Sequence, residues 1–371
     1  MYIPDVDSEE HLELRRTVRR FVEQQVTEAD VRRTIDDPEG LDRAVWSRMG
    51  AQLGLQGLAL PEEFGGADGG LLETVILFEE TGRALVPSPL LSTVGLAAPL
   101  LLALGDGGAC KQWLTDIAAG ELIAAVALPG GAYEPTSPPT VRAEPTADGW
   151  RLTGSASHVL DGALADLLLV VAATAEGPRV FAVRPREIEL GLTPLATLDL
   201  TRREADIVFD DTPAEPVGPA DRVADALDRA LTVAAVALAA EQTGGAEHLM
   251  AMAVEYAKIR YQFGRAIGSF QAIKHKLAEM AFDVERMHAA VRHAATVADD
   301  PAELAVAAEL AAKYCSEAFF RVAAETVQVH GGIGFTWEHP AHLYFRRAKA
   351  SEYLLGSPGS HGERLLALLG V

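Results

Sequence analysis

The apolar pattern of this 371-residue chain changes twice, and these two changes constrain its fold more than any other feature. From Ser8 to about Gly120, apolar residues recur at helical spacing. Between about Leu122 and Pro219, short runs such as DLLLVVAAT and EADIVF alternate with Gly, Pro and Asp, as strands alternate with turns. Long Ala- and Leu-rich helical segments return from Asp221 onward. The sequence therefore predicts an α+β protein in three parts.

These parts are predicted as three domains. Residues 1–121 form an N-terminal α-helical domain, residues 122–220 a small β-barrel or sandwich, and residues 221–371 a bundle of four long helices. Breaks between the C-terminal helices are expected at Gly264–Ser269, at Asp299–Pro301 and at the Gly331–Gly334 turn.

Composition excludes several classes of protein. No apolar run reaches the roughly 18 residues of a membrane span, and the acidic start lacks the pattern of a signal peptide, so a cytoplasmic protein is expected. Cys110 and Cys315 stand alone, outside any spacing typical of a disulfide framework or a metal site, which predicts buried, inert thiols and no metal.

The charge balance limits the ligands. A formal net charge of -21 repels nucleic acid and anionic membranes over the whole surface. It also repels phosphates, so any nucleotide must be held by local Arg and Lys residues or by helix amino termini.

Two C-terminal segments carry the strongest motifs. They are YAKIRYQFGRAIGSFQAIKHKLAEM, at Tyr256–Met280, and QVHGGIGFTWEHPAHLYFRRAK, at Gln328–Lys349. Their spaced Arg, Gln, Phe and Gly residues strongly resemble the C-terminal domain of acyl-CoA dehydrogenases, FAD enzymes that introduce a double bond between the α and β carbons of acyl-CoA thioesters. The helix–β–helix order is also that of this family, so the resemblance covers essentially the whole chain.

The resemblance implies contacts to the diphosphate and adenosine of FAD, made in this family across a subunit interface. An arginine suits a diphosphate because its planar guanidinium stays charged, and glycines let the backbone approach a ligand. The residues carried over are Arg260, Gln262, Phe263, Gln271, Gln328, Gly331 and Gly332. The alternative is that Arg260 is a solvated helix residue and that the glycines only end a helix.

The flavin-ring end of the family pattern is altered. Ala127 and Leu160 stand where the family has threonines near the ring, and Tyr133 replaces a serine. Neither Ala nor Leu has a side chain that can hydrogen-bond, so only the backbone could tune a flavin ring here.

The usual catalytic base is also missing. Leu355 precedes Gly356 where the family has a glutamate followed by glycine, and a thioester α-proton needs a carboxylate within hydrogen-bond reach. A minority of the family carries its glutamate about where Ala234 and Ala235 stand, so that position fails too.

Two glutamates remain as candidates for a substitute base. Glu241 and Glu352 could each supply a carboxylate, but both also fit ion-paired helix glutamates.

Two histidines, His330 and His339, lie near the cofactor motif and are predicted to be solvent or packing residues. The segment Val86–Leu101 falls where the family lines its acyl cavity, and its small residues suggest that this cavity is roomy.

The chain thus keeps the FAD-contacting residues and lacks the base. In this combination it resembles the subunits without a catalytic base in the heteromeric acyl-CoA dehydrogenases of actinobacterial steroid side-chain degradation. This resemblance predicts a companion subunit in an α2β2 assembly, which lends FAD contacts to a second acyl-CoA dehydrogenase subunit acting on a bulky, steroid-derived acyl-CoA. An electron-transferring flavoprotein is the expected acceptor. Two alternatives remain: a self-sufficient homo-oligomeric enzyme with a displaced base, and a relative that binds flavin or another ligand without dehydrogenation.

Overall fold

The structure is a computed structural model that describes residues 8–105 and 108–371. Its N-terminal part is helical. The helices are α1 (Glu9–Gln25), α2 (Glu28–Asp36), α3 (Arg43–Leu53), α4 (Leu71–Arg83), the π-helical segment η3 (Leu91–Ala97), α5 (Ala98–Leu104) and α6 (Ala109–Ala118), with short 3-10 turns η1 (Leu55–Gly57) and η2 (Glu62–Phe64). Side chains of Ser8, Thr27 and Asp42 accept hydrogen bonds from the first backbone N–H groups of α1, α2 and α3, which fixes where these helices begin.

The middle part is a β-barrel. Its strands are β1 (Ala124–Ala127), β2 (Arg142–Thr146), β3 (Gly149–Leu160), β4 (Leu167–Thr174), β5 (Gly177–Val183), β6 (Gly191–Pro194) and β7 (Glu204–Val217). The pairings β4–β2, β2–β3, β3–β7, β7–β5 and β5–β4 close a ring, with β1 and β6 attached outside it. The strand-like runs DLLLVVAAT and EADIVF of the sequence correspond to β4 and β7. Strands β2 and β6 are short and mostly exposed.

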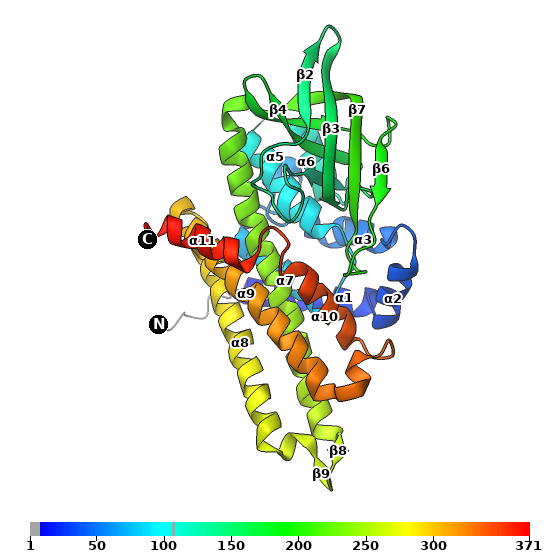
Figure 1. The fold of residues 1–371 in the computed structure, drawn as a ribbon, viewed down its shortest axis with the longest axis vertical. Helices are drawn as coiled ribbons and strands as arrows, with labels where there is room; N and C mark the ends of the chain where they lie inside the picture. The colour runs from blue at the N-terminus through cyan, green and yellow to red at the C-terminus, as the bar shows by residue number, and fades with distance from the viewer. Residues whose placement is uncertain (1–7, 106–107) are drawn as a thin grey trace.

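The C-terminal part is helical, as expected, but its helices differ in length. Three long helices, α7 (Val223–Ile259), α8 (Gln271–Thr296) and α9 (Pro301–His330), lie side by side (Figure 1). The 3-10 turn η6 (Gly331–Phe335) and two eleven-residue helices, α10 (Ala341–Ser351) and α11 (Pro358–Leu368), take the place of a fourth long helix. Gly331 has a positive φ where α9 ends, and Gly356 has a positive φ in the turn between α10 and α11.

The breaks between the long helices lie where the sequence predicts them. Asp300 caps the start of α9 by accepting hydrogen bonds from the backbone N–H groups of Ala302 and Glu303. The break between α7 and α8 contains a small hairpin of strands β8 (Tyr261–Gln262) and β9 (Arg265–Ala266), followed by the 3-10 turn η5 (Ile267–Ser269).

Helices α4 and α7 pack backbone against backbone at two glycines. A Cβ atom on Gly82 would lie 2.1 Å from the carbonyl oxygen of Glu241, and one on Gly244 would lie 1.8 Å from that of Glu79. Glycine is therefore required at both positions, and this close contact joins the N-terminal helices to the C-terminal helices in one apolar core.

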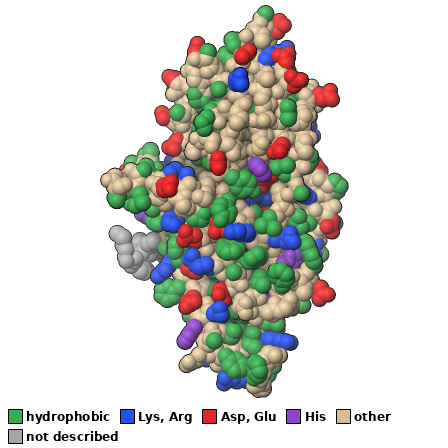
Figure 2. Space-filling view, in the orientation of Figure 1, with side chains coloured by type: hydrophobic (Ala, Val, Ile, Leu, Met, Phe, Trp, Pro, Cys, Tyr) green, Lys and Arg blue, Asp and Glu red, His purple; other side chains and the backbone are tan. Residues whose placement is uncertain are grey.

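The β-barrel and the β8–β9 hairpin lie at opposite ends of the longest axis of the molecule (Figure 1). Hydrophobic and basic side chains gather on the surface at the hairpin end (Figure 2). Cys110 and Cys315 are buried, as predicted, and burial raises the pKa of the Cys315 thiol to about 12. Within residues 8–105 and 108–371, no helix is long and apolar enough to cross a membrane, and no three His, Cys, Asp or Glu side chains form a metal-binding group.

Candidate cofactor site and the position of the missing base

The β8–β9 hairpin presents polar and aromatic side chains to the outside. Its two-residue turn, Phe263 and Gly264, has φ angles of 51° and 78°, as in the hairpin turns that favour glycine at the second position. Arg260, at the end of α7, and Gln262 are exposed, and the Phe263 side chain is 91% exposed. Ile259 and Tyr261 beside it are 74% and 65% exposed, and such a group of exposed large apolar side chains indicates a surface that another molecule covers.

A pocket of about 390 Å³ lies between this hairpin and the end of α9. The residues lining it are Tyr256, Arg260, Gln262, Phe263, Ile267, Phe270, Ile273, Val329, His330, Gly331 and Gly332. In a protein of net charge -21, this lining contains an arginine and no carboxylate. The pocket thus combines aromatic and apolar walls with a positive charge, which suits an anionic ligand that has an aromatic ring.

The histidines of this region serve packing. The ring of His330 stacks on Tyr256 with centroids 4.3 Å apart and meets the ring of His339 at 4.4 Å. Burial lowers the pKa of His330, which the hydrogen bond to the Thr326 carbonyl only partly offsets, so the ring is neutral at pH 7.

The glycines beside the pocket have open space around them. A Cβ atom on Gly331 or Gly332 would meet no other atom within 4 Å, so packing inside the chain does not require glycine at Gly332. Gly331 has a φ of 63°, which favours glycine by itself. Gln328 is exposed one position before the lining residue Val329, and Gln271 is exposed at the start of α8. The structure therefore brings all seven sequence-predicted cofactor residues to one end of the molecule.

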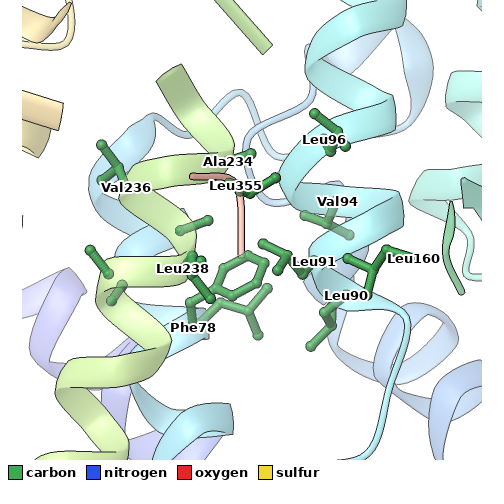
Figure 3. Packing of buried hydrophobic residues seen from close by; sticks show 14 of the residues in the cluster. Phe78, Leu90, Leu91, Val94, Leu96, Leu160, Ala234, Val236, Leu238 and Leu355 are labelled. Carbon is green, nitrogen blue, oxygen red and sulfur yellow. The ribbon is translucent and has the colours of Figure 1, made fainter. Parts of the chain in front are cut away.

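Leu355, where the sequence analysis expects the family's base, lies in the apolar core. Leu355 is 4% exposed and belongs to the same buried apolar cluster as Phe78, Leu91, Leu160 and Leu238 (Figure 3). Its backbone has a φ of 64°, which is unusual for leucine.

The loop between β1 and β2, which contains Tyr133, packs directly against Leu355. The carbonyl oxygen of Ala132 accepts a hydrogen bond from the backbone N–H of Leu355. The next residue, Tyr133, donates its hydroxyl to Glu204 at 2.6 Å, and His158 lies 2.7 Å from the same carboxylate. Ala127 and Leu160 are buried. The polar groups of this region are therefore satisfied within the chain.

The sequence analysis did not identify the Tyr133–Glu204–His158 group. Its members are 71 and 46 positions apart along the chain, and no local motif signals that they meet. The same holds for Asp161, which accepts a hydrogen bond from Ser92 at 2.7 Å; burial raises the pKa of its carboxyl to about 6.

Both candidate substitute bases are engaged in ion pairs. One oxygen of Glu241 accepts hydrogen bonds from Arg347 at 2.6 Å and from Arg202 at 2.5 Å. Arg347 is buried and also pairs with Asp199; burial acts to lower its pKa, but these two carboxylates outweigh burial and raise it. Glu352 pairs with Lys349 at 2.6 Å. Neither glutamate is a free carboxylate.

Comparisons with known proteins show the family of the chain. The patterns of the acyl-CoA dehydrogenase N-terminal and C-terminal domains match residues 8–121 and 224–367. Acyl-CoA dehydrogenase IpdE2 of Mycobacterium tuberculosis is 40% identical over 350 residues, which cover 94% of each protein. Acyl-CoA dehydrogenase FadE27 of the same organism is 36% identical over 85% of each.

Two solved structures are also similar over nearly their full length. The ChsE4–ChsE5 complex from Mycobacterium tuberculosis contains a chain that is 32% identical, with a TM-score of 0.89 over 99% of both chains. A chain of the Tcur3481–Tcur3483 steroid ACAD is 33% identical, with a TM-score of 0.88 over 98% of both chains.

Proposed function

Since the chain belongs to the acyl-CoA dehydrogenase family of oxidoreductases, we propose that it is the companion subunit of an FAD-dependent acyl-CoA dehydrogenase. In this role it contributes FAD contacts to a partner subunit, and the partner supplies the base that removes the α-proton of the acyl-CoA.

The observation that carries the proposal is the separation of two regions within the chain. The residues suited to a dinucleotide lie at the hairpin end, beyond the long helices, whereas Leu355 lies in the core close to the barrel loop that contains Ala132 (Figure 1). Because the hairpin points away from the barrel of its own chain, its side chains are available to the FAD of a neighbouring subunit.

The chain's own residues fit the nucleotide end of FAD. Arg260 would face the diphosphate, Phe263 would cover the cofactor, and the backbone at Gly332 would allow close approach, since no atom of the chain occupies that space. When bound, FAD supplies the hydride acceptor for the β-carbon.

The partner and substrate follow from the same reasoning. Leu355, Glu241 and Glu352 leave no free carboxylate at the positions considered for the base, so a second acyl-CoA dehydrogenase subunit is needed. An α2β2 assembly with a bulky, steroid-derived acyl-CoA as substrate is supported by relatives described as a two-protein complex and as a steroid ACAD. An electron-transferring flavoprotein as acceptor and a cytoplasmic location remain predictions.

The test compares the chain alone with the chain co-expressed with base-containing acyl-CoA dehydrogenase subunits. We expect little flavin in the isolated chain and a stable complement in the assembly. FAD-loaded isolated chain, mixed anaerobically with short, long and steroid acyl-CoAs, should keep its flavin absorbance. Rapid bleaching, abolished by Glu241→Gln or Glu352→Gln, would instead establish a self-sufficient homo-oligomeric enzyme.

A further inference from the structure

A groove of about 690 Å³ lies on the surface between α8 and α9, and it shares no lining residue with the cofactor pocket. Helices α7, α8 and α9 pack against one another, and within residues 8–105 and 108–371 no fourth long helix completes a bundle with them. The groove therefore has room for a helix from another molecule. Half of its twelve lining residues are apolar: Ala278, Met280, Phe282, Phe320, Val322 and Ala324.

An exposed aromatic side chain lies at this groove. Phe282 is 66% exposed, and the guanidinium of Arg286, one turn further along α8, lies over its ring at 5.3 Å. On α9, Phe320 packs against Phe345 with ring centroids 5.4 Å apart, which extends the apolar surface to α10. Exposed apolar surface with polar residues around it is typical of contacts between proteins. The outward surface of α8 and α9 around the groove is called the α8–α9 face below.

The charges at the groove balance, although the chain as a whole has a net charge of -21. The three basic and three acidic lining residues are Lys276, Arg286, Arg321, Glu279, Asp283 and Glu325. Charges in solvent act over only about 8 Å at physiological ionic strength, so the local balance decides whether two surfaces repel. Two copies of this acidic chain can therefore meet at the α8–α9 face without net repulsion.

The hairpin end does not suit a contact between two copies. From Tyr256 to Ala278 the sequence has five Lys or Arg residues and no carboxylate, so two hairpin ends would repel each other. Of the two exposed apolar surfaces, only the α8–α9 face is complementary in charge to itself.

Two of the six charges at the groove have no ion pair inside the chain. Lys276 pairs with Glu325 at 2.5 Å, and Arg321 pairs with Asp283 at 3.0 Å. Glu279 and Arg286 form no ion pair with any residue that the structure describes.

The spacing of these two residues fits a two-fold contact. Glu279 and Arg286 are seven residues apart and therefore lie on one face of α8, with Phe282 close to the midpoint between them. When two copies place α8 against α8 in antiparallel orientation about this midpoint, Glu279 of each copy faces Arg286 of the other. A two-fold contact needs a surface that is self-complementary in this way.

The α8–α9 face is large enough for a stable contact. Helix α8 has 26 residues, so it is about 39 Å long, and each helix is about 10 Å wide. Two such helices side by side present about 780 Å², close to the roughly 800 Å² that each partner buries in a standard stable interface.

We propose that two copies of this chain pair through the α8–α9 face, with α8 against α8 about a two-fold axis and Glu279 of each copy paired with Arg286 of the other. This contact goes beyond the proposed function, since it needs neither FAD nor a partner subunit. In an α2β2 assembly it joins the two copies of this chain.

The test measures the molar mass of the isolated, flavin-free chain by light scattering over a series of concentrations. We expect a dimer of twice the 39.4 kDa chain mass, which dissociates on dilution. Glu279→Arg or Arg286→Glu alone places like charges opposite each other twice in each dimer and should weaken pairing about ten-fold. Both residues are exposed, so neither change should disturb the fold.

A mixture of the two variants gives the sharpest result. An equimolar mixture should pair again, because the new arginine of one variant then faces the new glutamate of the other, and native Arg286 faces native Glu279. Arg142→Glu and Glu144→Arg, which reverse exposed charges on β2 of the barrel, are the matched controls and should leave the mass unchanged.

Three outcomes would overturn the proposal. The first is a monomer at every concentration, and the second is a dimer that neither single variant weakens or that the mixture does not restore. The third is a chain that is monomeric alone but fails to assemble with a base-containing subunit after Phe282→Glu, which would assign the α8–α9 face to that partner. Flavin binding enters none of these measurements, so this proposal and the proposed function can fail separately.

Discussion

The backbone N–H of Leu355 donates a hydrogen bond to the carbonyl oxygen of Ala132, at a distance of 2.7 Å. This bond joins the segment after α10 to the loop between β1 and β2. The N–H of Leu355 and the carbonyl oxygen of Ala132 are therefore paired within the protein, and the side chains of both residues are buried. A carboxylate added at Leu355 would therefore enter a packed core.

Leu355→Glu should destabilise the protein without creating a dehydrogenase. Loss of the apolar side chain and burial of a carboxyl together should cost about 3–5 kcal/mol of unfolding free energy. Denaturant unfolding measures this cost, with Leu355→Met as the conservative control, expected to lose less than about 1.5 kcal/mol. An unchanged unfolding midpoint for Leu355→Glu, with flavin bleached by an acyl-CoA, would mean that the core opens to substrate.

Arg260→Ala should weaken flavin retention in the assembly with a partner subunit. Removal of a charged donor from a diphosphate costs about 1.5–3 kcal/mol, or roughly ten- to a hundred-fold in affinity. Lys258→Ala is the matched control, because Lys258 is an exposed cation two positions earlier that pairs with Glu255. Flavin release is measured by fluorescence after dilution. Similar losses of flavin in both variants would show that Arg260 attracts the diphosphate only as one more positive charge and makes no direct contact with it.

Glu241→Gln should affect stability more than Glu352→Gln. Glu241 neutralises Arg347 and Arg202, and both of these are buried, so its replacement leaves buried charge unbalanced at a cost of about 3–5 kcal/mol. Glu352 pairs with Lys349, whose side chain is 38% exposed, and its loss should cost less than about 1 kcal/mol. Thermal unfolding of the two variants distinguishes these values. A larger effect of Glu352→Gln would contradict the structural role of Glu241.

The pair of His288 and Glu79 should make stability depend on pH. Burial acts to lower the pKa of His288, but the hydrogen bond and charge of Glu79, with the charge of Glu247, outweigh it and raise the pKa above its ordinary value of 6.5. Burial acts to raise the pKa of Glu79, and His288 and Arg15 reverse this and lower it below 4.5. Arg292 is the further charge that acts on His288.

The directions of these two pKa shifts determine the pH range in which the pair stabilises the protein. The contribution of His288 is full below its unfolded pKa and is lost as pH rises through its raised folded pKa. The contribution of Glu79 is full above its unfolded pKa and is lost as pH falls through its lowered folded pKa. The stability difference between the protein and His288→Gln should therefore be largest from about pH 4.5 to 6.5 and should shrink at higher pH. A difference that grows above pH 7 would show that the histidine acts in its neutral form.

Parts of the fold could be predicted because they depend on local chemistry. Helical spacing, strand alternation and Gly/Pro breaks act over a few residues, so the three-part order and the break at Asp300 were visible in the sequence. The turn at Gly331–Gly334 was also predicted. The segment after it forms two short helices instead of a fourth long one, because Leu355 and Gly356 adopt positive φ angles between α10 and α11.

The chemical groups of the candidate site were likewise determined by the sequence, since Arg260, Phe263 and Gly332 carry their charge, ring and small size wherever they lie. Only the tertiary structure decided what each group can reach. Long helices place the hairpin far from the barrel, packing buries Leu355 against Ala132, and residues more than a hundred positions apart join Glu241 to Arg347. These contacts are decided by the fold, because a hydrogen bond exists only where folding brings a donor within reach of an acceptor.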